Sequence, residues 1–502
     1  MKLNFEDFYQ QFLDVQAAFQ LANSTMYVDQ NTIAPKKGAA ATNKAMGILS
    51  QFAFEQANDP ELIAQIQDYY ARLPEDSLEK KELGLRLEQI ADLKDVPADV
   101  YGDYVKTRAD SETLWHEAKE AKDYGMFRDM LENIMTKQLN LYTYSPRYTG
   151  DNAYELALDA YEKGMDSAQY DEFFAVIKED LIPLIQKDTS AKQIDTTFLD
   201  HEVDVDKQAV FNEKVLDFLG RDKGRVYLST TEHPFTDFLS RNDNRITTHY
   251  YPNAFLSAVL STVHEYGHAL YSMQMDPALE NTMFDAIVGS AAHESQSRFL
   301  ENHIGRSYAF WKALYPELVK EFPEFADVTP EELARMINAS VPGLIRTEAD
   351  ELTYPLHILI RYEIEKMIAD GTLDYDKLPE IWADKYEQYL GVRPENDAEG
   401  VLQDMHWSAG YLGYFPTYAL GSAYAAQIYE AMCKDLDPEK ELAAGNTAAI
   451  TNWLQEHVHQ YGGTKTMKQI TEEVSCKPFD PHIYTNYLKD KYTRLYGLED
   501  QD

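Results

Sequence analysis

Residues 253–273 read NAFLSAVLSTVHEYGHALYSM, and the interpretation of the whole chain starts from this stretch. Apolar residues recur in it at three- and four-residue spacing, which predicts an α-helix that is apolar over most of its circumference. The apolar positions are Phe255, Leu256, Val259, Leu260, Val263 and Leu270. Such a helix must be buried, so the polar side chains of His264, Glu265 and His268 need partners in the interior.

His264 and His268 stand four residues apart, so they share one face of the predicted helix. Two imidazoles at this spacing can reach one Zn²⁺ at about 2.0 to 2.1 Å. Glu265 lies about 100° around the helix, where its carboxylate can contact a water at the metal without being a ligand. With 13 histidines in 502 residues, about 0.06 chance matches to this pattern are expected. The pattern therefore predicts a metal site.

A catalytic zinc site takes three protein ligands and leaves the fourth position open. Glu294, in the stretch HESQSR, is the predicted third ligand, because it lies on a second stretch with helical apolar spacing. The neighbouring His293 is the alternative ligand. If Glu294 binds the metal, we expect His293 to be a packing residue or to support a ligand.

Most of the remaining sequence has the spacing of amphipathic helices, as at Phe8, Phe12, Val15 and Phe19. Residues 224–251 differ, because β-branched and aromatic residues alternate there with polar ones. This segment predicts a small sheet of two or three strands. The fold class is therefore mainly α, with a small sheet beside the metal helix. A strand edge in that place could pair with an extended peptide.

The composition excludes several classes of partner. Lys and Arg number 46 against 85 Asp and Glu, a formal charge of −39, which opposes binding to nucleic acid or to anionic membranes. The two cysteines, Cys433 and Cys476, form no CxxC motif, so neither a disulfide framework nor a thiolate metal site is expected. No long apolar segment or signal-like N-terminus stands out, and we expect a cytoplasmic protein.

The chain resembles the carboxypeptidase Taq family of zinc metallocarboxypeptidases. Five of its motifs occur here in order: DNRIT at 243–247, HEYGH at 264–268, HESQ at 293–296, IRTEAD at 345–350 and GVLQDMHW at 400–407. Weaker similarity covers residues 233–236, Trp115 and residues 26–30, where Tyr27 stands in place of an expected Trp. The resemblance covers most of the chain.

The resemblance implies a large helical fold of the neurolysin and angiotensin-converting-enzyme type with a deep groove. In this view residues 1–502 form one metallocarboxypeptidase domain. Helices within about residues 1–100 partly cover the groove, and about residues 200–430 carry the catalytic centre. Enzymes of this kind are homodimeric exopeptidases with broad preference that remove single C-terminal residues, often sparing Pro.

Two types of residue are needed for that activity. Glu265 is the predicted general base, which takes a proton from the attacking water. A free C-terminal carboxylate calls for an arginine fork. Arg346 is the first candidate and Arg245 the second. For each the alternative is a structural salt bridge, with Asp350 and Asp243 respectively as the local partner.

The segment from His406 to Phe415 is similar to the His- and Tyr-rich segment that faces zinc in the converting-enzyme relatives. By that likeness Tyr414 donates its hydroxyl to the oxyanion and His406 binds the substrate or the oxyanion, while Tyr411 helps to hold the carboxylate. The alternative for each tyrosine is aromatic packing, since the chain has 35 tyrosines.

Two other functions compete with a carboxypeptidase. One is an oligoendopeptidase on the same scaffold, which would keep the metal site and differ at the end of the groove. The other is a helical binding protein with a structural zinc, which normally has four protein ligands and no need of Glu265. Co²⁺ or Mn²⁺ could replace Zn²⁺. The preferred C-terminal residue and the substrate length stay open.

Overall fold

The N-terminal half of the chain is helical, and its first helix covers the stretch from Phe8 to Phe19 that the apolar spacing predicts. The computed structural model describes residues 5–498. Local signals fix several helix starts: the Asp59 side chain accepts hydrogen bonds from two backbone N–H groups, and Pro60 follows at the first helical position. The helices before the sheet are α1 (Phe5–Thr32), α2 (Ala39–Ala57), α3 (Pro60–Tyr70), α4 (Leu78–Lys94), α5 (Ala98–Ala121), α6 (Arg128–Tyr142), α7 (Ala153–Tyr161), α8 (Ser167–Ser190) and α9 (Val205–Phe218).

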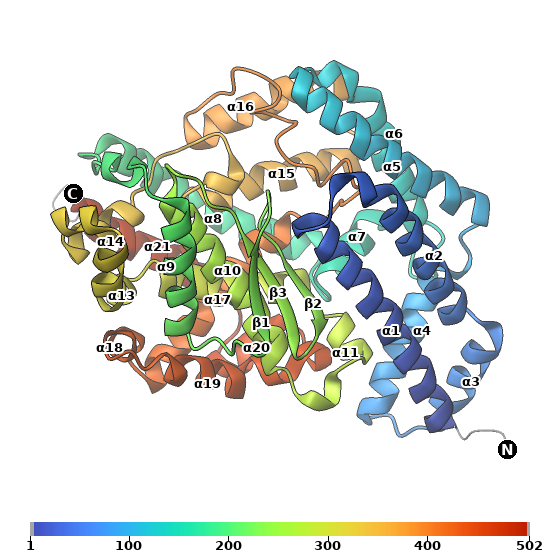
Figure 1. Ribbon diagram of the computed structural model, residues 1–502. Helices are drawn as coiled ribbons and strands as arrows, with labels where there is room; N and C mark the ends of the chain where they lie inside the picture. Colours follow the sequence, from blue (N-terminus) through green and yellow to red (C-terminus); the bar gives the residue numbers. More distant parts are fainter. Residues whose placement is uncertain (1–4, 499–502) are drawn as a thin grey trace.

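A three-stranded sheet follows, within the segment predicted for it. Its strands are β1 (Val226–Thr230), β2 (Thr236–Ser240) and β3 (Asp243–Thr248). The order is β1-β3-β2, with β1 parallel and β2 antiparallel to β3. One edge of β2 is therefore unpaired within the sheet, and α1 lies next to this strand (Figure 1).

The C-terminal half is again helical. Its helices are α10 (Phe255–Gln274), α11 (Met283–Ala286), α12 (Ser290–Arg298), α13 (Tyr308–Glu321), α14 (Pro330–Ile337), α15 (Tyr354–Ala369), α16 (Leu378–Leu390), α17 (Pro416–Asp435), α18 (Pro438–Ala443), α19 (Thr447–His457), α20 (Met467–Ser475) and α21 (Pro481–Tyr496). The predicted fold class, mainly α with a small sheet beside the metal helix, is confirmed.

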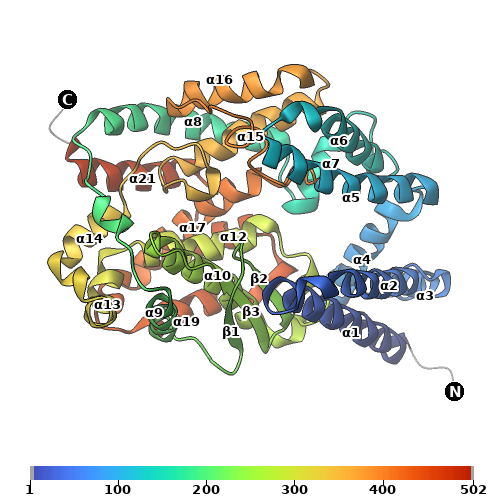
Figure 2. The ribbon, with the colours of Figure 1, turned by 45° about the horizontal axis from the view of Figure 1, so that its top comes forward.

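The helices form two layers around a large apolar core (Figure 2). Helices α5–α8, α15 and α16 lie in one layer, and the sheet with α9, α10 and α13 lies in the other. Helices α12 and α17 run between them. The N-terminal helices α1–α4 lie at one side, where α1, α3 and α4 share a small apolar cluster of their own. None of the helices within residues 5–498 has the length and apolarity that crossing a bilayer requires.

Candidate active site

The structure brings His264, His268 and Glu294 together. One ligand atom from each of these residues lies within 4.8 Å of the others. The Nε2 atoms of His264 and His268 are 3.9 and 3.8 Å from the Glu294 carboxylate oxygens. Tetrahedral zinc with bonds of about 2.0 to 2.2 Å holds its ligand atoms about 3.4 Å apart, so a small movement would close the group around an ion. Two imidazoles and a carboxylate, with no thiolate, form a donor set that suits catalytic zinc.

The close contact between α10 and α12 makes this grouping possible, and two glycines allow it. A Cβ at Gly267 would lie 2.6 Å from Cα of Ser297 in α12. On the other side of α12, a Cβ at Gly421 in α17 would lie 2.6 Å from Cβ of Glu294. Helix α12 is thus held between α10 and α17 at a distance that larger residues at these two positions would prevent.

Glu301 orients the first histidine from behind. Its carboxylate is 2.9 Å from Nδ1 of His264, which leaves Nε2 of that ring facing Glu294. Burial would raise the pKa of Glu301, but Arg298, His264 and Arg306 outweigh burial and hold this pKa below its usual range. Glu301 lies in a π-helical turn, Phe299–Gly305, that follows α12; such turns are frequent at functional sites.

Glu265 lies beside the ligand group without belonging to it. Its carboxylate accepts a hydrogen bond of 2.6 Å from the hydroxyl of Thr236, the first residue of β2. Burial raises the pKa of Glu265, although His264 and the Thr236 hydrogen bond act in the opposite direction. A carboxyl group with a raised pKa, held by the sheet next to a metal site, has the properties of a general base.

A group of tyrosines forms the opposite wall. Tyr414 and Tyr418 are half-buried, and both interact electrostatically with Glu294. His406 lies behind them, with Nε2 at 3.1 Å from the Tyr418 hydroxyl. Burial, reinforced by Arg346, lowers the pKa of His406 to about 3, so the imidazole is neutral. Tyr414 is therefore close to the metal group, and His406 is one layer further away.

The segment that carries His406 and Tyr414 is an irregular loop before α17, and Glu365 anchors it. This buried carboxylate accepts hydrogen bonds from Nε1 of Trp407 (2.9 Å), the backbone N–H of Gly413 (2.9 Å) and the hydroxyl of Tyr154 (3.0 Å). Burial raises the pKa of Glu365 to about 7. Gly413 adopts a positive φ of 91° against the backbone of α7, and this turn places Tyr414.

Arg346 is buried and already paired. Its Nε and Nη2 atoms lie 2.9 and 2.8 Å from the same oxygen of Asp404, whose other oxygen binds Arg361. The alternative interpretation was a structural salt bridge between Arg346 and Asp350. The carboxylate of Asp350 instead accepts hydrogen bonds from backbone N–H groups, including that of Thr353. Two guanidinium groups and one carboxylate leave an excess positive charge behind the tyrosine wall.

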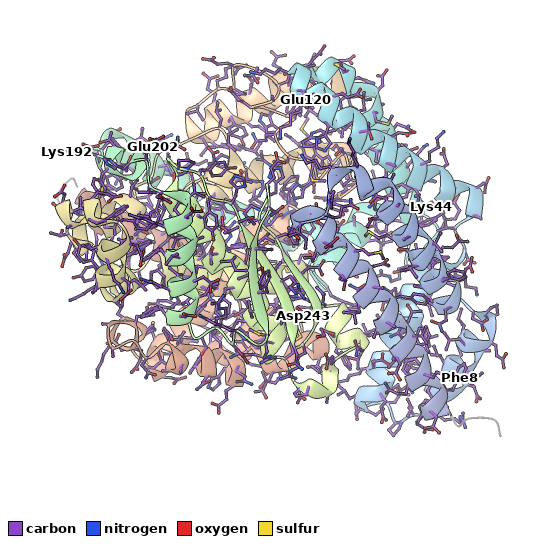
Figure 3. All side chains as sticks on the ribbon, in the orientation of Figure 1. Phe8, Lys44, Glu120, Lys192, Glu202 and Asp243 are labelled. Carbon is purple, nitrogen blue, oxygen red and sulfur yellow. The ribbon has the colours of Figure 1, made fainter. Side chains whose placement is uncertain are left out.

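Arg245 points away from the metal group. It pairs across the sheet with Asp237, whereas its neighbour Ile246 pairs with Thr236. Successive residues of a strand face opposite sides of the sheet, so Arg245 and Thr236 lie on opposite faces. The Arg245 guanidinium forms an ion pair with Asp243, at 2.8 Å for Nη2, at the start of β3 (Figure 3). This is the salt bridge that the alternative interpretation named.

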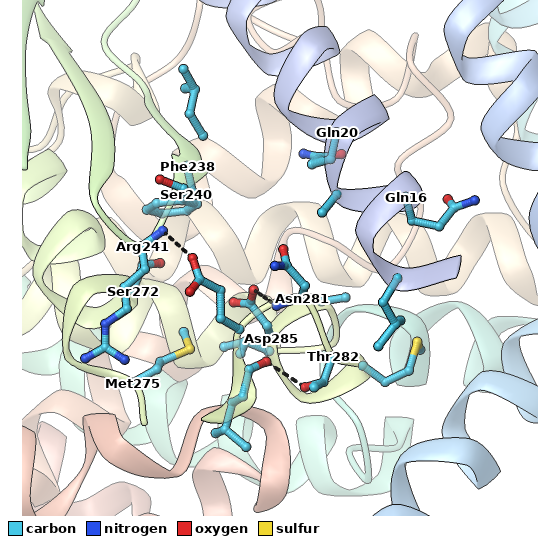
Figure 4. Close-up of a pocket in the computed structure, with 18 of the residues that line it drawn as sticks. Gln16, Gln20, Phe238, Ser240, Arg241, Ser272, Met275, Asn281, Thr282 and Asp285 are labelled. Carbon is cyan, nitrogen blue, oxygen red and sulfur yellow. Dashed lines mark hydrogen bonds between the residues drawn. The ribbon is translucent and has the colours of Figure 1, made fainter. Parts of the chain in front are cut away.

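His293 lies beside the ligand group and reaches into a cavity. Its ring packs on His268, at a centroid distance of 5.6 Å, and stacks on Phe238 of β2. Burial lowers the pKa of His293 to about 4. The cavity, of about 590 Å³, lies between β2, α1 and α11 (Figure 4). The first residue of β2, Thr236, therefore contacts Glu265, whereas residues from Phe238 to Arg241, at and just past the other end of β2, line the cavity.

Sequence reasoning missed the residues that hold the site from behind. The sequence gives only weak evidence for Glu301, because carboxylates are common in this acidic chain and one that follows Glu294 by two helical turns does not stand out. Thr236 lay in a motif, but its contact depends on how the sheet meets α10. Glu365 has no local signal, because its partners come from α7 and from the loop before α17.

The two-histidine, one-glutamate group with Glu265 beside it defines a metallopeptidase centre. The family model "Carboxypeptidase Taq (M32) metallopeptidase" matches residues 9–492, and the chain belongs to this family. It is a metallocarboxypeptidase. The family that the sequence motifs indicated is thus confirmed.

The chain is similar over nearly its full length to characterised relatives. It is 38% identical to Carboxypeptidase 1 of Bacillus subtilis, over 95% of this chain and 96% of that protein. It is 34% identical to Thermostable carboxypeptidase 1 of Thermus thermophilus, over 93% and 94%. The solved structure of the M32 carboxypeptidase from Deinococcus radiodurans R1 matches with a TM-score of 0.93 and 31% identity, over 97% of this chain and 99% of that one.

Proposed function

We propose that this metallocarboxypeptidase is zinc-dependent and releases single C-terminal residues from peptides, with Glu265 as the general base. The observation that carries the proposal is the group of two partly buried histidines, His264 and His268, and buried Glu294. Buried Glu265 lies next to His264 in the chain. Co²⁺ or Mn²⁺ are alternative ions. Family membership does not favour the oligoendopeptidase alternative.

A bound Zn²⁺ would polarise the scissile carbonyl and lower the pKa of a water molecule toward about 7. The residues of the chain handle the protons. Glu265 takes the proton from the attacking water and delivers it to the leaving amine. Thr236 keeps the Glu265 carboxylate directed at this position through the 2.6 Å hydrogen bond.

The oxyanion needs a hydrogen-bond donor on the side opposite Glu265. Tyr414 is our candidate, since it interacts electrostatically with Glu294 and is only partly buried as a residue. Burial raises the pKa of Tyr414 above its ordinary value, so its hydroxyl stays protonated and able to donate. One such donor is worth about 3 to 4 kcal/mol in the transition state. Neutral His406 supports Tyr414 through Tyr418.

The unpaired edge of β2 gives the peptide a path. An antiparallel peptide strand on this edge would run from the Arg241 end of β2 to the Thr236 end. Its N-terminal part would occupy the cavity beside Phe238 and His293 (Figure 4). Its last residue would lie beyond Thr236, between the sheet and the tyrosine wall. The size of the cavity is in the range of peptide and small-molecule sites.

The remaining expectations stay predictions. Arg346 and Arg245 are both engaged in ion pairs, so direct binding of the carboxylate by either would require that pair to break. The excess charge of Arg346 and Arg361 over Asp404 still favours an anion on this side. Broad specificity that spares Pro, a homodimeric assembly and a cytoplasmic location are supported by the resemblance and composition alone.

Mass spectrometry of the products from a free-ended peptide of about ten residues tests the proposal. We expect a ladder that loses one C-terminal residue at a time, no cleavage after chelation, and recovery with Zn²⁺. The same peptide with a C-terminal amide should be nearly inert. Internal cleavage of both peptides would instead identify an oligoendopeptidase.

A further inference from the structure

The surroundings of Tyr411 contain a positively charged side chain, Arg108, which lies in none of the five family motifs and is not part of the metal site. Arg108 lies on α5, one turn after Tyr104, and the Tyr104 hydroxyl lies 2.8 Å from the position that a Cβ of Gly410, the residue before Tyr411, would take. The guanidinium of Arg108 is close enough to Tyr411 and Tyr104 to interact with both electrostatically. Tyr411 also interacts electrostatically with Tyr27 of α1. The side chain of Arg108 is 45% exposed, and Tyr411 is 37% exposed. The two side chains are thus accessible to a ligand.

The engagement of Arg108 differs from that of the other arginines near the site. Arg346 is 7% exposed and held by Asp404. Arg298 and Arg306 form ion pairs with Glu301. The ionic partner of Arg108 is Glu112, one turn later on the same helix, at 3.3 Å and with 37% of its side chain exposed. Exposed pairs of this spacing are weak, so a substrate carboxylate can displace Glu112.

The position of Arg108 fits the predicted end of the peptide. The tyrosines form a continuous series from the metal group: Tyr414 interacts with Glu294, and its ring centroid lies 6.0 Å from that of Tyr411. Tyr411 then interacts with Arg108. These tyrosines lie near the Thr236 end of β2. Tyr27, which interacts with Tyr411, packs on Phe235 next to Thr236 at a centroid distance of 5.4 Å. The cavity at the other end of β2 would hold the N-terminal part of the substrate peptide.

We propose that Arg108, together with the Tyr411 hydroxyl, binds the C-terminal carboxylate of the substrate and makes the enzyme an exopeptidase. This inference rests on the proposed function. A guanidinium offers two parallel N–H donors to a carboxylate, and a phenol can add a third hydrogen bond. The positive charge of Arg346 and Arg361 behind the tyrosines adds to the attraction.

The test compares kcat/KM for a peptide with a free C-terminus and for its C-terminal amide. In R108A, kcat/KM for the free peptide should fall on the order of 10–100-fold, mainly through KM, because charge-assisted hydrogen bonds are lost. Hydrolysis of the amide should not change. R108K keeps the charge and should retain an intermediate preference, while Y411F should lose less than R108A.

Two control variants separate this effect from a general one. Arg72 forms the same kind of exposed pair, with Asp68 on α3, so R72A should leave both substrates unaffected. E112Q removes the competing carboxylate and should leave kcat/KM for the free peptide unchanged or higher. Thermal unfolding of each variant checks the fold, and exposed positions should shift Tm little.

The outcomes distinguish the two proposals. If the unaltered protein hydrolyses amide and free peptide equally, the proposed exopeptidase function is wrong. If it requires the free carboxylate but R108A and R108K keep the full preference, the function stands and the assignment to Arg108 is wrong.

Discussion

The two walls of the active site are held in different ways. The metal wall consists of regular helices, α10 and α12, which meet through glycines and are locked by ion pairs around Glu301. The tyrosine wall combines the start of α17, which carries Tyr418, with an irregular loop that carries Tyr414. A single buried carboxylate, Glu365, holds this loop against α7. Helix contacts fix the ligand atoms closely, whereas two hydrogen bonds, from Trp407 and Gly413, tie the loop to the one side chain of Glu365.

This difference separates two kinds of defect. A change in the metal wall should lower metal affinity, and turnover should fall as a consequence. A change in the tyrosine wall should leave the metal in place and lower turnover alone. Measuring bound metal and kcat on the same variants therefore tells which wall a residue supports.

The largest expected effect is that of E265Q. This variant tests whether turnover can be lost within the metal wall while metal binding is kept. Glu265 is not among the grouped ligands, so bound zinc should be unchanged. Loss of a general base should lower kcat by about 10²–10⁴-fold. Metal analysis and kcat on one preparation check this. Loss of zinc from E265Q would contradict the assignment of Glu265 as base only.

G267A should break the metal wall by separating its helices. The added Cβ would meet backbone atoms of α12 at 2.6 and 2.7 Å, and backbone cannot move aside as a side chain can. We expect a loss of about 1–3 kcal/mol in the free energy of unfolding, with loss of zinc and activity. G47A in α2, where nothing lies within 4 Å, is the control and should be neutral or stabilising.

E301Q should weaken the metal wall without moving it. The amide keeps the shape of the side chain but removes the charge that faces His264, Arg298 and Arg306. Zinc affinity should fall about 10–100-fold, as measured by competition with a chromophoric chelator. E317Q, which breaks a surface ion pair with Lys214, should keep full affinity. Equal affinity in E301Q would remove Glu301 from the site.

E365Q should affect the tyrosine wall alone. One acceptor oxygen becomes an N–H donor that faces Trp407 or Gly413, so at least one anchoring hydrogen bond is lost. We expect kcat to fall on the order of 10-fold with zinc content unchanged. E363Q in the same helix α15 disrupts contacts with Lys178 and Lys385 and should keep kcat. Zinc loss in E365Q would show that the walls are not independent.

The smallest effect on activity is expected from E162Q. Glu162 follows α7 and accepts a hydrogen bond from the backbone N–H of Ala291, near the start of α12. Burial raises the pKa of Glu162 to about 8, although hydrogen bonds from the backbone of Ala291 and Ala292 oppose the shift. Between about pH 4.5 and 8 the folded protein therefore binds this proton while the unfolded chain releases it. The contribution of Glu162 to the free energy of unfolding falls as pH rises through that window.

Denaturant unfolding at pH 5.5 and pH 8 measures this contribution. Gln cannot titrate, so E162Q should gain stability relative to the unaltered protein between the two pH values, by on the order of 2 kcal/mol. Activity at neutral pH should be nearly unchanged. Parallel pH dependence in the two proteins would show that Glu162 has an ordinary pKa.

Much of the fold and the metal group could be predicted from the sequence because both depend on local spacing. His264, Glu265 and His268 lie on one helix, and the period of that helix fixes their relation whatever surrounds them. The amphipathic spacing predicted the helices, and the alternating segment 224–251 predicted a sheet of two or three strands, where the structure has three. Glu294 was preferred to His293 as a third ligand because a site of this kind needs one on a second helical stretch, and the structure brings Glu294 to the two histidines.

The tertiary structure decided which distant residues meet. Asp404 rather than Asp350 pairs with Arg346, and the strand register turns Arg245 away from the metal group. Glu301, Glu365 and Arg108 act on partners from other elements. Such contacts are set by the packing of whole helices against each other, and no spacing along the chain records how that packing brings their side chains together.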